Sequence, residues 1–175
     1  MEAVKWFRKA AEQGNVIAKC RLGFCYEYGY GVEKDLVAAN QWYLKAAEQG
    51  YAQAQSFLGD NLRRGVGCEK DYAEAVKWYL KAAEKGSAYA QSQLGYCYEN
   101  GYGVEKDFQK AVEWFHKAAE GGDVAAATRY GSLLEAGCGV EKDLVAANQW
   151  YLKAAEQGYE EAQSFLGDNL FSVCP

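Results

Sequence analysis

Side chains suited to catalysis are scarce in this 175-residue sequence, which contains a single histidine, His116. A metal site built from several imidazoles is therefore excluded, and a Ser–His or Cys–His nucleophile would have to use this one side chain. We expect His116 to be a solvated or packing residue. The sequence thus predicts no catalytic residue, no metal site and no enzyme.

Six cysteines are the other reactive groups, and none of them forms a Cys-x-x-Cys motif. A disulfide needs α-carbons closer than about 7 Å, which Cys20 and Cys25 on one helix, or Cys25 and Cys97 two repeats apart, do not offer. Cys138 and Cys174 share one loop position in neighbouring repeats, so their redox state stays open. Mostly free thiols favour a reducing, cytoplasmic location.

Four loops carry the sequence Gly-x-Gly-x-Glu-Lys-Asp, beginning at Gly29, Gly65, Gly101 and Gly137. They resemble phosphate-binding loops only superficially, because a lysine replaces the third glycine and no strand pattern precedes them. We interpret these loops as turns and expect no nucleotide or other cofactor.

The charge balance limits the partners. The chain has 24 acidic and 19 basic residues and a formal net charge of −5, which disfavours nucleic acid. It contains neither a secretory signal nor an apolar run of about 18 residues, so no membrane insertion is expected.

An internal repeat organises the whole sequence. Lys-Ala-Ala-Glu recurs every 36 residues from Lys9, and all five tryptophans, from Trp6 onwards, follow the same period. This predicts one repeat domain over residues 1–175. Its expected parts are a partial first repeat (1–14), four full repeats (near 15–50, 51–86, 87–122 and 123–158) and a partial last repeat (159–175).

Each full repeat predicts two helices, called here the A helix and the B helix. Apolar residues three to four apart mark both, an aspartate such as Asp35 suits the start of the B helix, and a glycine such as Gly50 suits its end. A glycine inside each A helix, such as Gly23, predicts close contact with a Trp or Tyr of a B helix. We expect ten antiparallel helices: B at 1–13, pairs at 16–28/35–49, 52–64/71–85, 88–100/107–121 and 124–136/143–157, and A at 160–171. Stacked pairs imply an all-α superhelical solenoid.

This pattern resembles the Sel-1-like repeat, a relative of the tetratricopeptide repeat. In one repeat the matching residues are Ala90, Leu94, Gly95, Tyr98, Gly101, Gly103, Val104, Asp107, Ala111, Trp114, Phe115, Lys117, Ala118, Ala119 and Gly122. The resemblance covers about 170 residues and implies a helical scaffold or adaptor for protein complexes. One branch, the cysteine-rich proteins of Helicobacter, is linked with penicillin binding and weak β-lactamase activity. Alanines here replace that branch's regular helix-B cysteine (Ala47, Ala83, Ala119), and no Ser-x-x-Lys or Lys-Thr-Gly motif is present.

Positions where the repeats disagree are the candidates for recognition, because shared positions are explained by packing. On the A helices they follow i, i+4, i+7 and i+11, and so share one face. In related solenoids the A helices line the concave surface, so the resemblance implies a groove there. The candidates are Arg21, Phe24, Tyr28, Phe57, Asp60, Arg64, Tyr89, Gln93, Tyr96, Asn100 and Arg129. The alternative is that phenylalanines such as Phe24, Phe57 and Phe165 belong to the core between repeats.

These observations predict a non-catalytic scaffold or adaptor that binds a peptide or protein of unknown identity on the concave A-helix face. Two other readings are a structural array that self-associates through uncapped ends, and a penicillin-binding or weakly hydrolytic protein. Residues 31–62 and 139–170 differ only at Ala52/Gln53 and Glu160/Glu161, which indicates a recent duplication or a synthetic array.

Overall fold

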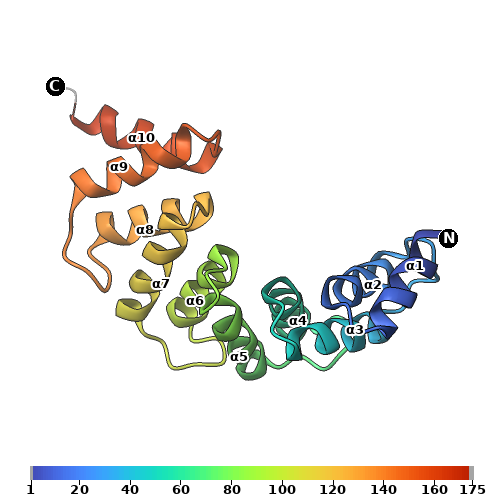
Figure 1. Cartoon of the computed structure of the whole chain (residues 1–175). Helices are drawn as coiled ribbons and strands as arrows, with labels where there is room; N and C mark the ends of the chain where they lie inside the picture. The colour runs from blue at the N-terminus through green and yellow to red at the C-terminus, as the bar shows by residue number, and fades with distance from the viewer. Residues whose placement is uncertain (1, 174–175) are drawn as a thin grey trace. The chain divides into compact units, whose positions relative to one another are not determined.

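The computed structural model describes residues 2–173, and within this range it contains ten α-helices and no strand (Figure 1). The B helices are α1 (Glu2–Glu12), α3 (Leu36–Glu48), α5 (Tyr72–Ala83), α7 (Phe108–Glu120) and α9 (Leu144–Ala155). The A helices are α2 (Val16–Tyr28), α4 (Ala52–Arg64), α6 (Ala88–Asn100), α8 (Val124–Ala136) and α10 (Glu160–Val173). The all-α prediction and the order of the helices are confirmed.

Aspartate and glycine fix the ends of the B helices as expected. The carboxylate of Asp35 accepts hydrogen bonds from the amides of Val37 and Ala38, at 3.0 and 2.9 Å, and so caps α3. Gly50, just past the end of this helix, has a φ of 84°, which costs glycine no side-chain strain. The capping aspartates lie outside the helices, which explains why the B helices begin one residue later than predicted.

The glycine inside each A helix makes room for an aromatic ring. A β-carbon added at Gly23 would lie 2.7 Å from the ring of Tyr43, closer than any side chain tolerates. The equivalent pairs are Gly59 with Tyr79, Gly95 with Phe115, and Gly131 with Tyr151. The expected close contact is therefore confirmed, and the ring is that of the residue after each tryptophan. These four aromatic rings are completely buried.

Each tryptophan instead interacts with the lysine of the Lys-Ala-Ala-Glu motif one turn later. The ammonium of Lys81 lies 3.9 Å from the ring centroid of Trp78, and the other four repeats place theirs at 4.3 to 5.5 Å. Such a cation–π contact favours one side-chain arrangement at a partly exposed helix surface. The strict repetition of both residues is thus explained within a single helix.

Between a B helix and the next A helix, one pair of equivalent residues is polar in some repeats and apolar in others. The amide of Asn61 donates to the side-chain oxygen of Asn40 at 2.8 Å, and the amide of Asn40 donates to the carbonyl of Val66. Asn169 and Asn148 repeat the pair at 2.9 Å. The equivalent positions elsewhere are apolar, as in Val112 with Leu133. The two members of a pair therefore change together.

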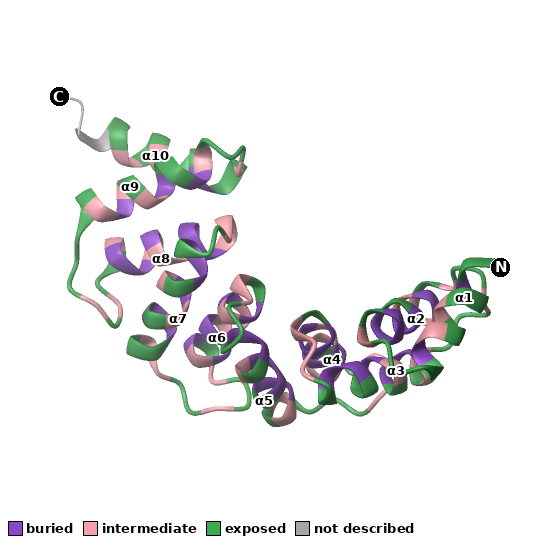
Figure 2. Cartoon of the chain, viewed as in Figure 1, coloured by how far each residue is buried: buried purple, intermediate pink, exposed green. Residues whose placement is uncertain are grey.

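The helices group into two compact units, residues 1–85 and 86–175. In the first, α2 packs on α1 and α3, and α4 on α3 and α5, around a core that includes Tyr43 and Leu58. In the second, α6 to α10 pack in the same order around Phe115 and Tyr151. Buried and exposed residues alternate along each helix (Figure 2). The single domain over residues 1–175 stays a prediction.

Candidate interaction surface

A small crevice between the A helices α2 and α4 collects several of the predicted residues. Its volume is about 50 Å³, and it is lined by Ile17, Cys20, Arg21, Phe24, Tyr51, Gln53 and Phe57. Arg21 is exposed, and within residues 2–173 no carboxylate forms an ion pair with it. Ile17 at the same edge is 52% exposed. The crevice therefore joins an unneutralised guanidinium to accessible apolar surface.

Three aromatic rings extend this surface along α2. The centroids of Phe24 and Tyr28 are 4.5 Å apart, and Tyr30, in the following loop, lies 5.8 and 5.9 Å from Phe24 and Tyr28. Tyr28 and Tyr30 are 54% and 59% exposed. We call these three residues the aromatic cluster. Exposed aromatic rings held against one another offer apolar contact area at little cost in side-chain entropy.

The predicted residues of α4 serve two purposes. Phe57 is half-buried, with its ring centroid 5.3 Å from that of Tyr43, so it belongs both to the crevice wall and to the core. Asp60 accepts a hydrogen bond of 2.6 Å from the hydroxyl of Tyr79. Arg64 is exposed. Phe57 therefore belongs in part to the core between repeats, as the alternative interpretation of the phenylalanines expects, and in part to the A-helix surface.

The same crevice recurs in the second unit, between α8 and α10. Its volume is about 30 Å³, and it is lined by Tyr96, Ala125, Thr128, Arg129, Ser132, Glu161 and Phe165. Arg129 occupies the position of Arg21 but is paired: two guanidinium nitrogens donate to the carboxylate of Glu99, which is only 6% exposed. This hydrogen-bonded pair raises the pKa of Arg129, and the charge of Glu161 acts in the same direction.

The partner of each A-helix carboxylate depends on the aromatic residue of the following B helix. Tyr43 donates to Glu27 at 2.6 Å and Tyr151 donates to Glu135 at 2.8 Å, so each carboxylate has a hydroxyl donor. Burial and these hydrogen bonds raise the pKa of both tyrosines. Where the B helix carries Phe115, no hydroxyl is available, and Arg129 from α8 replaces it as donor to the equivalent carboxylate.

The remaining predicted residues lie on α6. Tyr89 is exposed, Gln93 is half-buried, and Asn100 is exposed with its amide donating to the carbonyl of Tyr96. The Tyr96 ring meets Phe115 edge to face at 4.9 Å, and burial raises the pKa of its hydroxyl. The eleven candidates thus fall into one group per unit, and each group lies on A helices.

The eleven candidates do not include Gln53 and Tyr51, which line the α2/α4 crevice, or Tyr30 and Glu99 beside the two crevices. Tyr51 donates to Gln53 at 3.0 Å, as Tyr159 donates to Glu161 in the second unit. A signal for Gln53 was present, since residues 31–62 and 139–170 differ only at 52/53 and 160/161.

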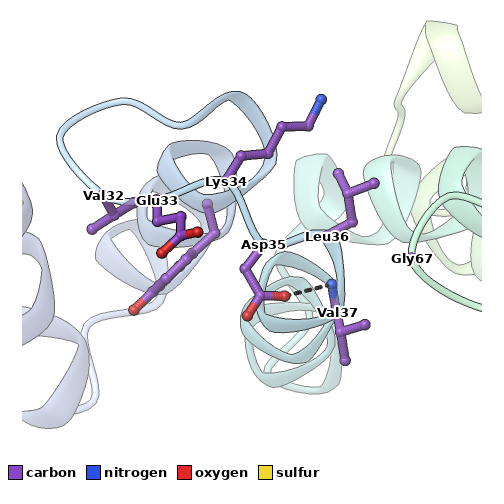
Figure 3. Close-up of a pocket in the computed structure, with 8 residues that line it drawn as sticks. Val32, Glu33, Lys34, Asp35, Leu36, Val37 and Gly67 are labelled. Atoms are coloured by element: carbon purple, nitrogen blue, oxygen red, sulfur yellow. Dashed lines mark hydrogen bonds between the residues drawn. The ribbon is translucent and has the colours of Figure 1, made fainter.

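A larger hollow, of about 940 Å³, lies along the loop that precedes α3 (Figure 3). It is lined by Tyr26, residues 32–37 and Gly67. The Asp35 carboxylate there is already used as the cap of α3. A β-carbon at Gly67 would lie 2.4 Å from the carbonyl oxygen of Leu36, so this glycine allows one loop to pack on the next helix. These features confirm the interpretation of the glycine loops as turns.

Other reactive groups have structural surroundings. His116 packs 4.9 Å from the ring of Tyr130 and 5.7 Å from that of Trp150. The five described cysteines are thiols, and burial raises the pKa of Cys20 to about 11. Cys174 lies outside the described residues. In the described part of the chain, no three His, Cys, Asp or Glu side chains gather as a metal site, and no helix has the length and apolarity to cross a bilayer.

An array of paired helices that presents crevices rather than an enclosed site is typical of solenoid scaffolds. The family model of the Sel1 repeat matches residues 1–15, 16–51, 52–87, 88–123 and 124–159. The chain therefore belongs to the Sel1 repeat family, and the resemblance noted in its sequence is confirmed. Sel1 repeats generally serve as protein–protein interaction scaffolds. No curated protein matches the chain significantly.

Solved structures support this assignment. A protective antigen of uropathogenic Escherichia coli is 43% identical, with a TM-score of 0.92 over 94% of this chain and 35% of its own. A Sel1 repeat protein from Oxalobacter formigenes is also 43% identical, with a TM-score of 0.87 over 95% of this chain and 71% of its own. Cysteine-rich protein B of Helicobacter pylori is 32% identical, with a TM-score of 0.61 over 76% and 96%. This chain spans about a third of the first of these proteins, and the matches confirm the α-solenoid fold.

Proposed function

We propose that this chain is a non-catalytic protein–protein interaction module that binds a peptide or protein surface through the exposed positions of its A helices. The observation that carries this proposal is that residues shared by all repeats have structural roles, whereas exposed residues of the A helices differ from repeat to repeat. Residues shared by all repeats cap helices, seat rings or stack on tryptophans. The positions that differ between repeats include the exposed Arg21, Tyr28, Arg64 and Tyr89.

The size of the crevices supports a surface contact over a small-molecule site. Pockets for small ligands usually enclose about 300–1,000 Å³, whereas the two A-helix crevices measure about 50 and 30 Å³. Exposed tyrosine and arginine side chains are common among residues that dominate protein interfaces. One similar structure, 28% identical, is described as an immunity protein of Pseudomonas aeruginosa, a name that fits an interaction role.

Affinity capture from a lysate of the source cell, followed by mass spectrometry, tests this function. The test variant is Arg21→Ala/Tyr28→Ala/Arg64→Ala, because these side chains are exposed, whereas truncation of Phe57 or Tyr96 would open the core. We expect it to lose the captured partner and to keep its helical circular dichroism. The matched control, Gln41→Ala/Glu48→Ala on the exposed side of α3, should retain the partner. Equal capture by both variants would contradict the proposed surface.

Two further expectations stay predictions. One is the self-association of the array, which rests on the sequence alone. The cytoplasmic location rests on the sequence alone.

A further inference from the structure

We infer that the crevice between α2 and α4 binds an acidic peptide segment, in which a carboxylate side chain pairs with Arg21 and a neighbouring apolar side chain packs on the aromatic cluster. This inference rests on the proposed function and specifies the chemistry of its ligand. Its main support is a charge difference between two crevices of otherwise matching construction.

One wall position that brings negative charge to the arginine of the second unit is neutral in the α2/α4 crevice. Arg129 is held by the buried Glu99 and faces Glu161 across its crevice. At the position of Glu161, the α2/α4 crevice carries Gln53, whose side-chain oxygen already accepts from Tyr51. Arg21 therefore lacks the wall carboxylate that Arg129 has in Glu161, and no ion pair within residues 2–173 neutralises it. A ligand carboxylate supplies the missing charge.

The charges of the A helices show the same contrast. Helices α2 and α4 carry four basic residues (Lys19, Arg21, Arg63, Arg64) and two acidic ones (Glu27, Asp60). Both carboxylates accept tyrosine hydroxyls. Helices α6, α8 and α10 carry one basic residue, Arg129, and five acidic ones. Residues 1–85 contain thirteen Lys and Arg against eleven Asp and Glu, formally +2, whereas residues 86–175 contain six against thirteen, formally −7.

The apolar half of the ligand follows from the neighbours of Arg21. Ile17 lies one turn before it and Phe24 one turn after it, and the ring of Phe24 continues into those of Tyr28 and Tyr30. A charge-assisted hydrogen bond beside apolar contact area is a frequent combination at the centre of protein interfaces. A peptide with Asp or Glu close to Phe, Leu, Tyr or Trp satisfies both requirements.

Selection of random dodecapeptides displayed on phage, with the full chain immobilised, tests the inference. We expect the selected pool to be enriched in Asp or Glu next to a large apolar residue. Selected peptides, synthesised with a fluorescent label, should bind Arg21→Gln about tenfold more weakly, because a charge-assisted hydrogen bond to the exposed Arg21 is lost. Gln53→Glu, which copies the residue found at position 161, should weaken binding several-fold through repulsion.

Glu161→Gln is the matched control, since it alters the same position of the second crevice and should leave binding unchanged. Unchanged binding by both Arg21→Gln and Gln53→Glu would overturn the inference. A pool without acidic residues that still loses binding in the Arg21/Tyr28/Arg64 variant would overturn the acidic ligand but leave the proposed function intact. Failure to enrich any peptide, together with a lysate partner captured through the same surface, would overturn the peptide ligand alone. Failure of both experiments would overturn both proposals.

Discussion

The α2/α4 and α8/α10 crevices are built from equivalent repeat positions, but among the described residues the arginine of one is unpaired and that of the other forms an ion pair. Arg129 completes a buried ion pair with Glu99, whereas Arg21 is left exposed beside aromatic rings. In the second unit Phe115 has no hydroxyl to offer Glu99, and Arg129 serves as the donor to that carboxylate. An arginine at this repeat position can therefore stabilise the fold through a buried carboxylate, as Arg129 does, or remain exposed, as Arg21 does.

Truncation of the two arginines should separate their roles most clearly. Arg129→Ala leaves the Glu99 carboxylate buried without its donor. It should lower the free energy of unfolding by about 2–3 kcal/mol, somewhat less than for a fully buried pair because Arg129 is half-exposed. Arg21→Ala should change it by less than about 0.5 kcal/mol. Urea unfolding followed by far-UV circular dichroism measures both, and similar costs would mean that the comparison is wrong.

A hydroxyl restored to the core ring should release Arg129 from its structural role. In Phe115→Tyr, Glu99 should accept the new hydroxyl, as Glu27 accepts that of Tyr43. The cost of Arg129→Ala should then fall by about 1–2 kcal/mol, which a double-mutant cycle measures directly. An additive cycle would show that the phenylalanine does not determine the partner of Glu99.

Exchange of the wall residues should have the smallest effect. Glu161→Gln removes an attraction to Arg129, and Gln53→Glu adds one to Arg21. The two changes should alter the free energy of unfolding in opposite directions, each by less than about 0.5 kcal/mol at low salt. Melting curves at low salt and in molar sodium chloride test this, because the effects should disappear at high salt. Shifts of the same sign would contradict the electrostatic assignment.

The sequence predicted the helices well because their ends are encoded locally. Asp35 and Gly50 act within a few residues of their own position, and the 36-residue period carries the same signals through the chain. The A-helix face was predicted for a similar reason: Arg21 and Phe24 are three residues apart on one helix and so line one crevice.

The state of each arginine was beyond prediction because it depends on contacts across the fold. Glu99 and Arg129 are 30 residues apart on two A helices, and both match a repeat position at which other residues are equally compatible with a helix. Phe57 shows the same limit. Helical spacing places it on the A-helix face, but its contact with the buried Tyr43 follows only from the packing of α3 against α4.

The asparagine pairs determine where repeats can be exchanged by recombination. Asn40 and Asn61 join a B helix to the next A helix, and the duplicated segment 31–62 contains both. A crossover in a Gly-x-Gly loop copies the pair whole. A crossover between the B helix and the A helix would place an asparagine opposite valine or leucine, leaving a buried amide unpaired at a cost of about 1–3 kcal/mol. The unit that can be duplicated or exchanged without loss of these contacts is therefore a B helix followed by an A helix, bounded by the glycine loops.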